Sequence, residues 1–219
     1  MRRLAVFARS PVPGQVKSRL SPALPAGLAA GLYAAMLTDT LIAATACEAD
    51  ERWLLWADSP GETPAHFHAK RQCGADLGAR LRQAFEDLLP GSYDRALIIG
   101  SDTPPLTAAH LDEAFEALDQ HDVVLGPTGD GGYWCIGLRR TAPALFDDIP
   151  WSTREVLTRT LVRAHAAGLR ATTVATLDDL DTPHDVAMLM GALAAGLPAC
   201  GPQARERLHV LGLLPAFAR

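Results

Sequence analysis

Two cations stand in a loop, rich in proline and glycine, that follows the first apolar stretch of the chain. Residues 4–8 are apolar, and residues 9–20 then read Arg-Ser-Pro-Val-Pro-Gly-Gln-Val-Lys-Ser-Arg-Leu. Backbone amides and fixed positive charge in such a loop can hold a phosphate group, so Lys17 and Arg19 are candidate phosphate ligands. A Walker loop has glycine immediately before its lysine, and Val16 stands there instead. The loop is compatible with phosphate binding without being a P-loop; the alternative is two solvated surface cations.

Carboxylates follow two further stretches that are typical of strands. Asp102 stands just past residues 95–99, and Asp179 and Asp181 stand one residue apart after residues 171–175. In an extended segment, side chains two positions apart point the same way, so Asp179 and Asp181 can share one ion. Carboxylate oxygens suit a divalent cation such as a diphosphate substrate would require. The alternative for each is a structural role, as an Asx turn or at a helix N-terminus.

A glycine-rich segment, residues 129–132, places Asp130 shortly before Tyr133. Glycine lets the backbone approach a ligand closely, and Asp130 is a candidate base for the proton of a reacting hydroxyl. An Asp-Gly hairpin turn explains the same residues equally well. These glycines lead into a predicted strand and not a helix, so they are no dinucleotide fingerprint. Further on, residues 151–153 (Trp-Ser-Thr) offer a ring for stacking and a hydroxyl.

Stretches typical of strands alternate with stretches typical of helices along the whole chain. Strands are predicted at residues 4–8, 53–57, 95–99, 122–125, 133–138 and 171–175. Helices are predicted at residues 25–47, 77–89, 107–118, 152–167, 182–195 and 202–213, with Ser152 and Thr153 as candidate caps of the fourth. This alternation predicts an α/β fold with a mainly parallel sheet, whose ligands bind outside the carboxyl ends of the strands. The loops after strands are therefore where a site is expected.

The composition is that of an ordinary globular chain. Its 219 residues are 48% hydrophobic and 21% charged, enough for a sizeable core, and we expect one domain. Twenty basic against 25 acidic residues give a net charge of −5, whereas a protein that binds duplex nucleic acid normally has a basic excess. The composition therefore argues against nucleic acid as a partner.

Neither a membrane span nor a signal peptide is expected. Residues 186–200 form the longest apolar stretch near the C-terminus, but glycine and proline interrupt it and it falls short of a span of ~20 residues. The apolar residues 4–8 are too few for the core of a signal peptide. Four cysteines stand far apart, at Cys47, Cys73, Cys135 and Cys200. They form no Cys-x-x-Cys and predict reduced thiols in a cytoplasmic protein.

Several ordered motifs together resemble one family. They are Phe7-Ala8-Arg9-Ser10-Pro11-Val12-Pro13-Gly14 with Lys17-Ser18-Arg19-Leu20, Gly100-Ser101-Asp102-Thr103-Pro104, Asp130-Gly131-Gly132-Tyr133, Trp151-Ser152-Thr153, and Asp179-Leu180-Asp181-Thr182-Pro183, with Gln72-x-Gly74-x-Asp76-Leu77-Gly78-x-Arg80 fitting the same pattern. In this order they resemble the small bacterial glycosyltransferase-A-like proteins often labelled arsenosugar biosynthesis glycosyltransferases. That group lies in the nucleotide-diphospho-sugar transferase superfamily and is related to the phospholactate guanylyltransferases. The sequence departs from the pattern at Trp134, where a second tyrosine or a similar ring is expected.

The resemblance implies a three-layer α/β fold with a mixed, mainly parallel sheet, in one domain over residues 1–219. It implies a nucleotide-binding half at about residues 1–105, an acceptor half at about 106–195 and a C-terminal helical tail at about 196–219. It also implies Mg²⁺ or Mn²⁺ as a cofactor, and as partners a nucleotide or nucleotide-sugar donor and a small-molecule acceptor.

The same resemblance assigns roles to individual residues. Nucleotide binding falls to Ala8, Arg9, Ser10, Gly14, Lys17, Arg19, Gln72, Asp76 and Gly78. Acceptor binding falls to Gly131, Gly132, Tyr133, Trp151, Ser152 and Thr153. The metal ligands are Asp102, Asp179 and Asp181, and the catalytic residues are Asp130 and Lys17.

Three functions stay open at this point, and glycosyl transfer is favoured on the family label. It needs a base such as Asp130 for the acceptor hydroxyl. Nucleotidyl transfer to an acceptor phosphate needs no base, but it needs cations beside the acceptor, for which Arg139, Arg140 and Arg154 are candidates. A nucleotide-binding module without turnover is the third.

Overall fold

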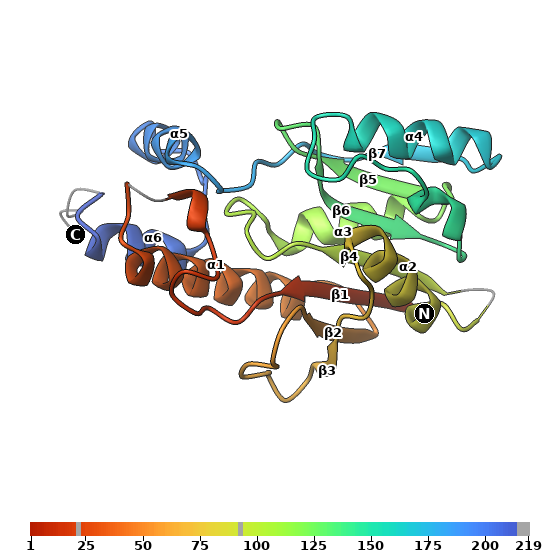
Figure 1. The fold of residues 1–219 in the computed structure, drawn as a ribbon, viewed down its shortest axis with the longest axis horizontal. Helices are drawn as coiled ribbons and strands as arrows, with labels where there is room; N and C mark the ends of the chain where they lie inside the picture. The colour runs from red at the N-terminus through yellow and green to blue at the C-terminus, as the bar shows by residue number, and fades with distance from the viewer. Residues whose placement is uncertain (21–22, 92–93, 214–219) are drawn as a thin grey trace.

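The computed structural model describes residues 1–20, 23–91 and 94–213, and it is built on one seven-stranded sheet (Figure 1). The strands are β1 (Arg2–Ala8), β2 (Glu51–Trp56), β3 (His68–Arg71), β4 (Arg95–Ile99), β5 (Val123–Pro127), β6 (Tyr133–Leu138) and β7 (Ala171–Thr173). Their order across the sheet is β3-β2-β1-β4-β6-β5-β7. Neighbouring strands are parallel except where β6 pairs with β4 and β5. The predicted α/β fold with a mixed, mainly parallel sheet is confirmed.

Helices cover both faces of the sheet. They are α1 (Ala26–Ala46), α2 (Leu77–Leu88), α3 (Ala108–Ala117), α4 (Val156–Ala166), α5 (Pro183–Ala194) and α6 (Pro202–Val210), with short 3₁₀ turns η1 (Ser18–Leu20) and η2 (Pro143–Phe146). One core joins a sheet face to α1, α3, α5 and α6, and the other joins the opposite face to α2, α4 and η2. Helices α5 and α6 lie beyond the carboxyl ends of the strands (Figure 1).

Strand β4 shows why the central strands are continuous apolar runs. Leu97 and Ile99 point into the core on the α1 face, whereas Ala96 and Ile98 point into the core on the α2 face. Successive side chains of a strand alternate between faces, so a strand covered on both sides needs apolar residues at every position. The same argument identifies the segment from the sequence alone.

Strand β3 was not predicted, because the pattern used to find strands is absent from it. Its residues, His68–Arg71, are polar except Ala69, and all four are exposed. The strand lies at the edge of the sheet and pairs with β2 only. An exposed edge strand need not contain apolar residues, and charged side chains there are common.

Helix α4 begins later than predicted, so Ser152 and Thr153 are not its caps. Its N-cap is Glu155, and Ser152 has a left-handed backbone with φ +65°. The Thr153 hydroxyl donates to the carbonyl of Pro150 and accepts from the N–H of Glu155, which closes a turn ahead of the helix. Threonine hydroxyls can close such local turns as well as cap helices, so the residue type alone does not distinguish the two.

The C-terminal part of the chain agrees with the expected elements. The N-cap of α5 is Thr182, with Pro183 in the first turn and Asp185 completing a capping box. Helix α6 confirms the helix predicted from residue 202, although it ends at Val210. The rest of the predicted helical tail, residues 214–219, lies outside the described residues.

Helix α1 is long and largely apolar. Within the described residues it is the one helix long and apolar enough to cross a bilayer, with 21 residues and a mean hydropathy of 1.4. Such a composition is also typical of a core helix. In this fold Leu32, Met36 and Ala44 of α1 are buried in the core beneath the sheet.

Candidate active site

The side chain of Lys17 links three segments that are distant in the sequence. Its Nζ donates to Oδ2 of Asp102 at 2.8 Å and to Oδ1 of Asp181 at 2.6 Å. The Lys17 side chain is 4% exposed, and its backbone is left-handed with φ +50°. A non-glycine residue held in that region costs about 1–3 kcal/mol, and such residues gather at functional sites. Lys17 is therefore held at the centre of the candidate site.

The two carboxylates keep Lys17 charged. Burial by itself would lower the pKa of the Lys17 ammonium, but the negative charges of Asp102 and Asp181 raise it above the ordinary lysine value. A raised pKa means that the ammonium stays protonated at neutral pH. The centre of the site is thus a positive charge held between two negative ones.

Asp179 lies beside this pair without bonding to Lys17. Its Oδ1 accepts from the Thr103 hydroxyl at 2.5 Å. Burial and the charge of Asp102 raise the pKa of the Asp179 carboxyl well above its ordinary value. The backbone N–H of Leu180 donates to the carbonyl of Asp102, which holds the two acidic segments together.

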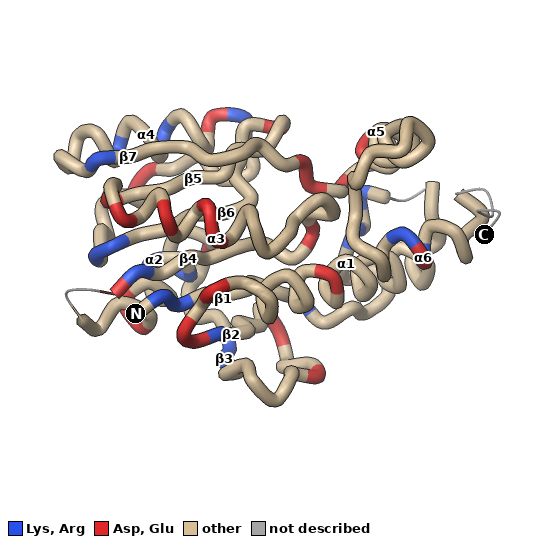
Figure 2. Tube along the Cα trace, turned by 180° about the vertical axis from the view of Figure 1, so that it is seen from behind, with Lys and Arg blue, Asp and Glu red and all other residues tan. Residues whose placement is uncertain are grey.

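Helix α5 fixes the position of Asp181. The Asp185 carboxylate accepts from the backbone N–H groups of Asp181 and Thr182 and from the Thr182 hydroxyl. Burial would raise the pKa of Asp185, but these hydrogen bonds lower it below its ordinary value. The capping box therefore places Asp181 directly ahead of α5. Figure 2 shows the acidic residues of the segment between β7 and α5.

The three predicted metal ligands come together, but not as an open cage. The described residues hold no group of three or more His, Cys, Asp and Glu side chains arranged to bind a metal ion. Asp102 and Asp181 nevertheless direct one oxygen each at a single point, which the Lys17 nitrogen occupies. Converging carboxylate oxygens are the donor set that Mg²⁺ or Mn²⁺ takes. The chemistry of these oxygens therefore suits a divalent cation, while in this structure the Lys17 ammonium holds the point between them.

A cavity of about 500 Å³, the first cavity, opens beside Lys17 at the carboxyl ends of β1 and β4. The predicted nucleotide-binding residues that line it are Ala8, Arg9, Lys17, Arg19 and Gln72. Asp102 and Asp181 line it too. Ligands in open α/β sheets bind at this edge.

The other four residues assigned to the nucleotide do not line the first cavity, and three of them have clear structural contacts. Ser10 donates to Asp58 through its N–H and its hydroxyl. The Asp76 carboxylate caps α2 by accepting from the N–H of Ala79. A Cβ on Gly78 would lie 2.9 Å from the Trp151 indole nitrogen. The fourth, Gly14, lies in the loop with φ +81°.

Tyr33 lines the first cavity and was missed by sequence reasoning. Its hydroxyl accepts from the backbone N–H of Arg9 at 2.9 Å and shares a hydrogen bond of 2.8 Å with the Ser101 hydroxyl. Burial raises the pKa of Tyr33. The residue joins the loop after β1 to the end of β4, but in the sequence it is one aromatic among the apolar residues of a helix. Arg80 also lines the cavity, and its place in the motif at residues 72–80 was the available signal.

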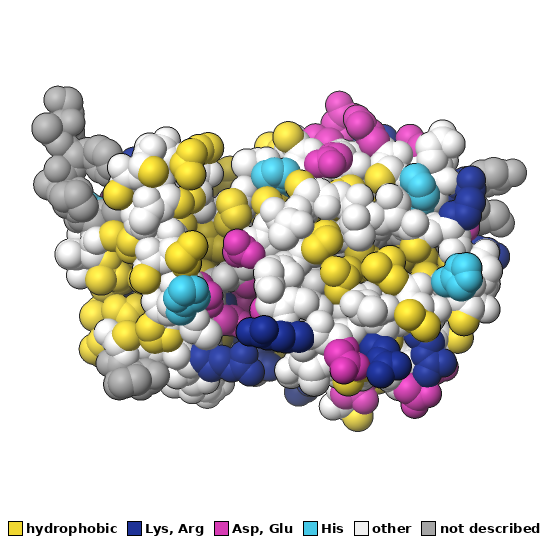
Figure 3. All heavy atoms as spheres, turned by 90° about the horizontal axis from the view of Figure 1, so that it is seen from above, with side chains coloured by type: hydrophobic (Ala, Val, Ile, Leu, Met, Phe, Trp, Pro, Cys, Tyr) yellow, Lys and Arg dark blue, Asp and Glu magenta, His cyan; other side chains and the backbone are white. Residues whose placement is uncertain are grey.

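A second cavity, of about 380 Å³, holds most of the predicted acceptor residues. Its lining includes Asp130, Gly132, Tyr133, Trp151, Ser152 and Thr153. Arg154 lines it as well, whereas Arg139 bonds to the carbonyl of Asp119 and Arg140 lies near Asp122. Arg19, Leu77 and Asp181 line both cavities, so the two adjoin. Figure 3 shows acidic side chains in the hollow between the part that carries α5 and the part that carries α4, with basic ones along its rim.

The loop around Asp130 forms a hairpin turn and also faces the second cavity. Oδ1 of Asp130 accepts from the Thr128 hydroxyl at 2.6 Å and from the N–H of Gly132 at 3.0 Å. Gly131 does not line the cavity, but with φ +89° it packs against the backbone of Arg154. These contacts support the interpretation of this segment as a hairpin turn. Oδ2 of Asp130 takes part in neither of the two hydrogen bonds.

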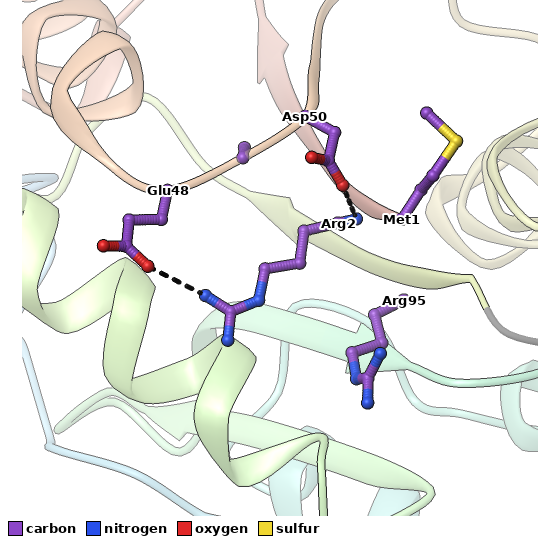
Figure 4. A pocket seen from close by; sticks show the side chains of 6 residues that line it. Met1, Arg2, Glu48, Asp50 and Arg95 are labelled. Carbon is purple, nitrogen blue, oxygen red and sulfur yellow. Dashed lines mark hydrogen bonds and ion pairs between the residues drawn. The ribbon is translucent and has the colours of Figure 1, made fainter.

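A hollow of about 510 Å³ lies at the other end of the strands, lined by Met1, Arg2, Glu48, Ala49, Asp50 and Arg95 (Figure 4). Its charges are paired within the fold. Arg2 donates to Glu48 and Asp50, and Arg95 pairs with Asp119. None of the predicted site residues lies there, so the candidate active site is the pair of cavities that share Arg19 and Asp181.

Comparisons with known proteins agree with a nucleotide-dependent transferase fold. A solved structure from Desulfovibrio desulfuricans G20, provisionally named a nucleotide-diphospho-sugar transferase, superposes with a TM-score of 0.84 at 26% identity, covering 97% of this chain and 95% of that one. The 2-phospho-L-lactate guanylyltransferase of Methanothermobacter thermautotrophicus is 32% identical over 136 residues. That match spans 59% of this chain and 59% of the relative.

Two more distant structures share the fold alone. A CMP:2-keto-3-deoxy-manno-octonic acid synthetase, solved in complex with CTP, has a TM-score of 0.54 at 12% identity and covers 90% of this chain and 99% of that one. Rv0371c of Mycobacterium tuberculosis H37Rv, solved in complex with manganese, has a TM-score of 0.50 at 17% identity, covering 85% and 96%. Structural neighbours of this chain thus bind a nucleotide in one case and manganese in another.

The family profile that matches this chain is described as uncharacterized proteins conserved in bacteria, and the match covers residues 29–153. This segment contains Asp102, Asp130 and residues 151–153, but not the cationic loop or the late aspartates. Because the match covers more than half of the chain, the protein belongs to the bacterial DUF2064 family.

Proposed function

We propose that the protein is a transferase that binds a nucleotide-activated donor in the first cavity and a small acceptor in the second. The observation that carries this proposal is the cluster of Lys17, Asp102 and Asp181, which lines the first cavity and reaches the second through Asp181. Charged groups at the junction are where a phosphate must be held while it or its substituent is transferred. Arg19 lines both cavities and adds positive charge there.

The residues of the first cavity would hold the donor by its phosphates. The Lys17 ammonium and the Arg19 guanidinium supply charge-assisted hydrogen bonds to phosphate oxygens. A divalent cation held by Asp102 and Asp181 would offset the negative charge of adjacent phosphates. The manganese complex of Rv0371c, which shares the fold, supports Mg²⁺ or Mn²⁺ in that role.

Nucleotidyl transfer is the reaction that the second cavity supports best. Arg154 and Arg19 line this cavity beside the carboxylates of Asp130, Asp179 and Asp181, and these two arginines are the cations that an acceptor phosphate or carboxylate would bind. Its oxygen attacks the α-phosphorus of a nucleoside triphosphate, a P–O bond forms, and the bond to the leaving pyrophosphate breaks. An ionised acceptor has no proton to lose, so the reaction needs no base. The 32% identity to a guanylyltransferase supports the same reaction.

Glycosyl transfer is the second candidate, and Asp130 is the observation that favours it. Its carboxylate lines the second cavity, where a base for an acceptor hydroxyl would have to lie. The likeness over nearly the whole chain to the Desulfovibrio desulfuricans structure is consistent with either reaction.

Donor preference separates the two reactions. With Mg²⁺ present, we expect nucleoside triphosphates to raise the melting temperature more than the diphospho-sugars of the same base. A ligand at 100 times its Kd stabilises by about 2.7 kcal/mol, enough for a thermal-shift measurement to detect. A matched pair of triphosphate and diphospho-sugar for each base makes the comparison independent of base preference. Stabilisation by diphospho-sugars alone would instead support glycosyl transfer, and stabilisation by neither would contradict a nucleotide-dependent transferase.

The Asp130→Asn variant tests the need for a base. Asparagine keeps an oxygen that can accept from Thr128 and Gly132, so the turn should persist. We expect turnover to stay within about tenfold of wild type, because loss of a general base costs about 10²–10⁴ and nucleotidyl transfer uses none. Pyrophosphate and nucleoside diphosphate release would be measured with a panel of phosphorylated and hydroxylated acceptors. A drop of 10² or more at unchanged donor affinity would make Asp130 the base and favour glycosyl transfer.

A further inference from the structure

We propose that Lys17 occupies the cation position of the site until phosphate arrives, so that a divalent cation binds only together with the nucleotide. The inference rests on the proposed function and adds the condition under which the metal ion binds. It begins from one geometric fact: the oxygens best placed to bind a metal ion, Oδ2 of Asp102 and Oδ1 of Asp181, are both already bonded to the Lys17 ammonium.

A divalent cation and the ammonium cannot share these oxygens. The Lys17 nitrogen lies 2.8 Å from one and 2.6 Å from the other, whereas Mg²⁺ takes oxygen ligands at about 2.0–2.1 Å. A metal ion bridging the same two carboxylates would therefore lie close to the ammonium, and the two positive charges would repel strongly at that separation. Metal binding requires the Lys17 side chain to leave.

Lys17 has no compensation for leaving the carboxylates while the site lacks phosphate. Its ammonium would give up the ion pairs with both Asp102 and Asp181 and gain no anionic partner in the first cavity. Its backbone lies in the loop that lines the first cavity. A phosphate group in that cavity supplies new anionic oxygens to the ammonium and frees the carboxylates for the metal ion.

Metal and nucleotide binding are then linked in both directions. The nucleotide raises the affinity for the metal ion by removing Lys17 from the carboxylates, and by thermodynamic necessity the metal raises the affinity for the nucleotide by the same factor. Arg19 offers a matched comparison. It lines the same cavity with the same charge, yet neither Asp102 nor Asp181 is bonded to it.

The test is the affinity of the full chain for Mn²⁺ alone, measured from the electron paramagnetic resonance signal of free Mn²⁺. We expect wild type to bind Mn²⁺ weakly and Lys17→Met to bind it about tenfold or more tightly. Arg19→Met removes the same charge from the same cavity without freeing either carboxylate, so its gain should be much smaller than that of Lys17→Met. The double variant Lys17→Met with Asp102→Asn should lose the gain, which assigns the ion to these carboxylates. If Lys17→Met binds Mn²⁺ no more tightly than wild type does, the inference is wrong.

A second measurement serves if Lys17→Met does not fold. In wild type carrying ¹³C-labelled lysine, the Lys17 side-chain resonance should stay in place with Mg²⁺ alone and shift when a nucleoside triphosphate is added with it. A shift with Mg²⁺ alone would overturn the inference. The proposed function has a separate outcome: it fails if neither nucleoside triphosphates nor diphospho-sugars bind wild type, with or without metal, whichever way the Mn²⁺ comparison falls.

Discussion

Asp102→Asn is expected to bind nucleotide with Mg²⁺ present no better than wild type binds it in a chelator. The substitution keeps the size of the side chain and removes the charge that the cation position needs, while Asp181 keeps its bond to Lys17. Turnover should fall by about 10²–10³, the usual cost of removing one electrostatic stabiliser of a transition state. Titration calorimetry with and without chelator measures the first effect, and product release measures the second.

Asp147→Asn is the matched control for this prediction. Asp147 is a surface carboxylate that pairs with Arg82 and lines neither cavity. Because Asp147 lines neither cavity, its loss should leave nucleotide affinity and turnover unchanged. The fold should also persist, because an exposed ion pair contributes about 0–1 kcal/mol to stability. Metal-dependent affinity that persists in Asp102→Asn would show that Asp102 does not hold the cation.

Gly131→Ala is expected to lower the free energy of unfolding by about 2–5 kcal/mol and to damage the acceptor side of the site. Gly131 has φ +89°, and a Cβ there would lie 2.2 Å from the carbonyl oxygen of Arg154. The N–H of Leu157 also donates to the carbonyl of Gly131 at 2.9 Å, so the hairpin and the start of α4 are held together here. A methyl group must push apart the two segments that line the second cavity. Urea denaturation measures the stability, and acceptor KM against donor affinity measures the damage to the site.

Gly168→Ala separates the cost of a left-handed backbone from the cost of the steric contact with Arg154. Gly168 has φ +67°, but a Cβ at this position would meet nothing within 4 Å. It should therefore show only the cost of a left-handed backbone, about 1–2 kcal/mol, with turnover unchanged. Equal losses in the two variants would mean that the contact with Arg154 contributes nothing. A weaker donor affinity in Gly131→Ala would mean that this loop also supports the first cavity.

The sequence determined the features of this protein that depend on residues adjacent in the chain, namely most of its strands, helices and helix caps. Residues 96–99 are all apolar because β4 is covered on both faces, and Thr182 with Pro183 opens α5 by local capping. Alternating strands and helices were enough to predict the α/β fold and to direct the search to the loops after strands. Where local signals compete, as they do at Thr153, the residue types alone did not decide between a turn and a helix cap.

Only the tertiary structure decided how the candidate residues meet. Lys17 bonds to carboxylates 85 and 164 positions away, and no local pattern encodes that an ammonium group would lie between two of the three aspartates predicted to hold a metal ion. Tyr33 reached the site for the same reason, from a helix whose sequence indicates only a core. The fold brings such residues together through the packing of helices on both faces of a sheet, and this packing depends on contacts along the whole chain. Local sequence patterns therefore identified the charged side chains, and the path of the folded backbone decided which charges became neighbours.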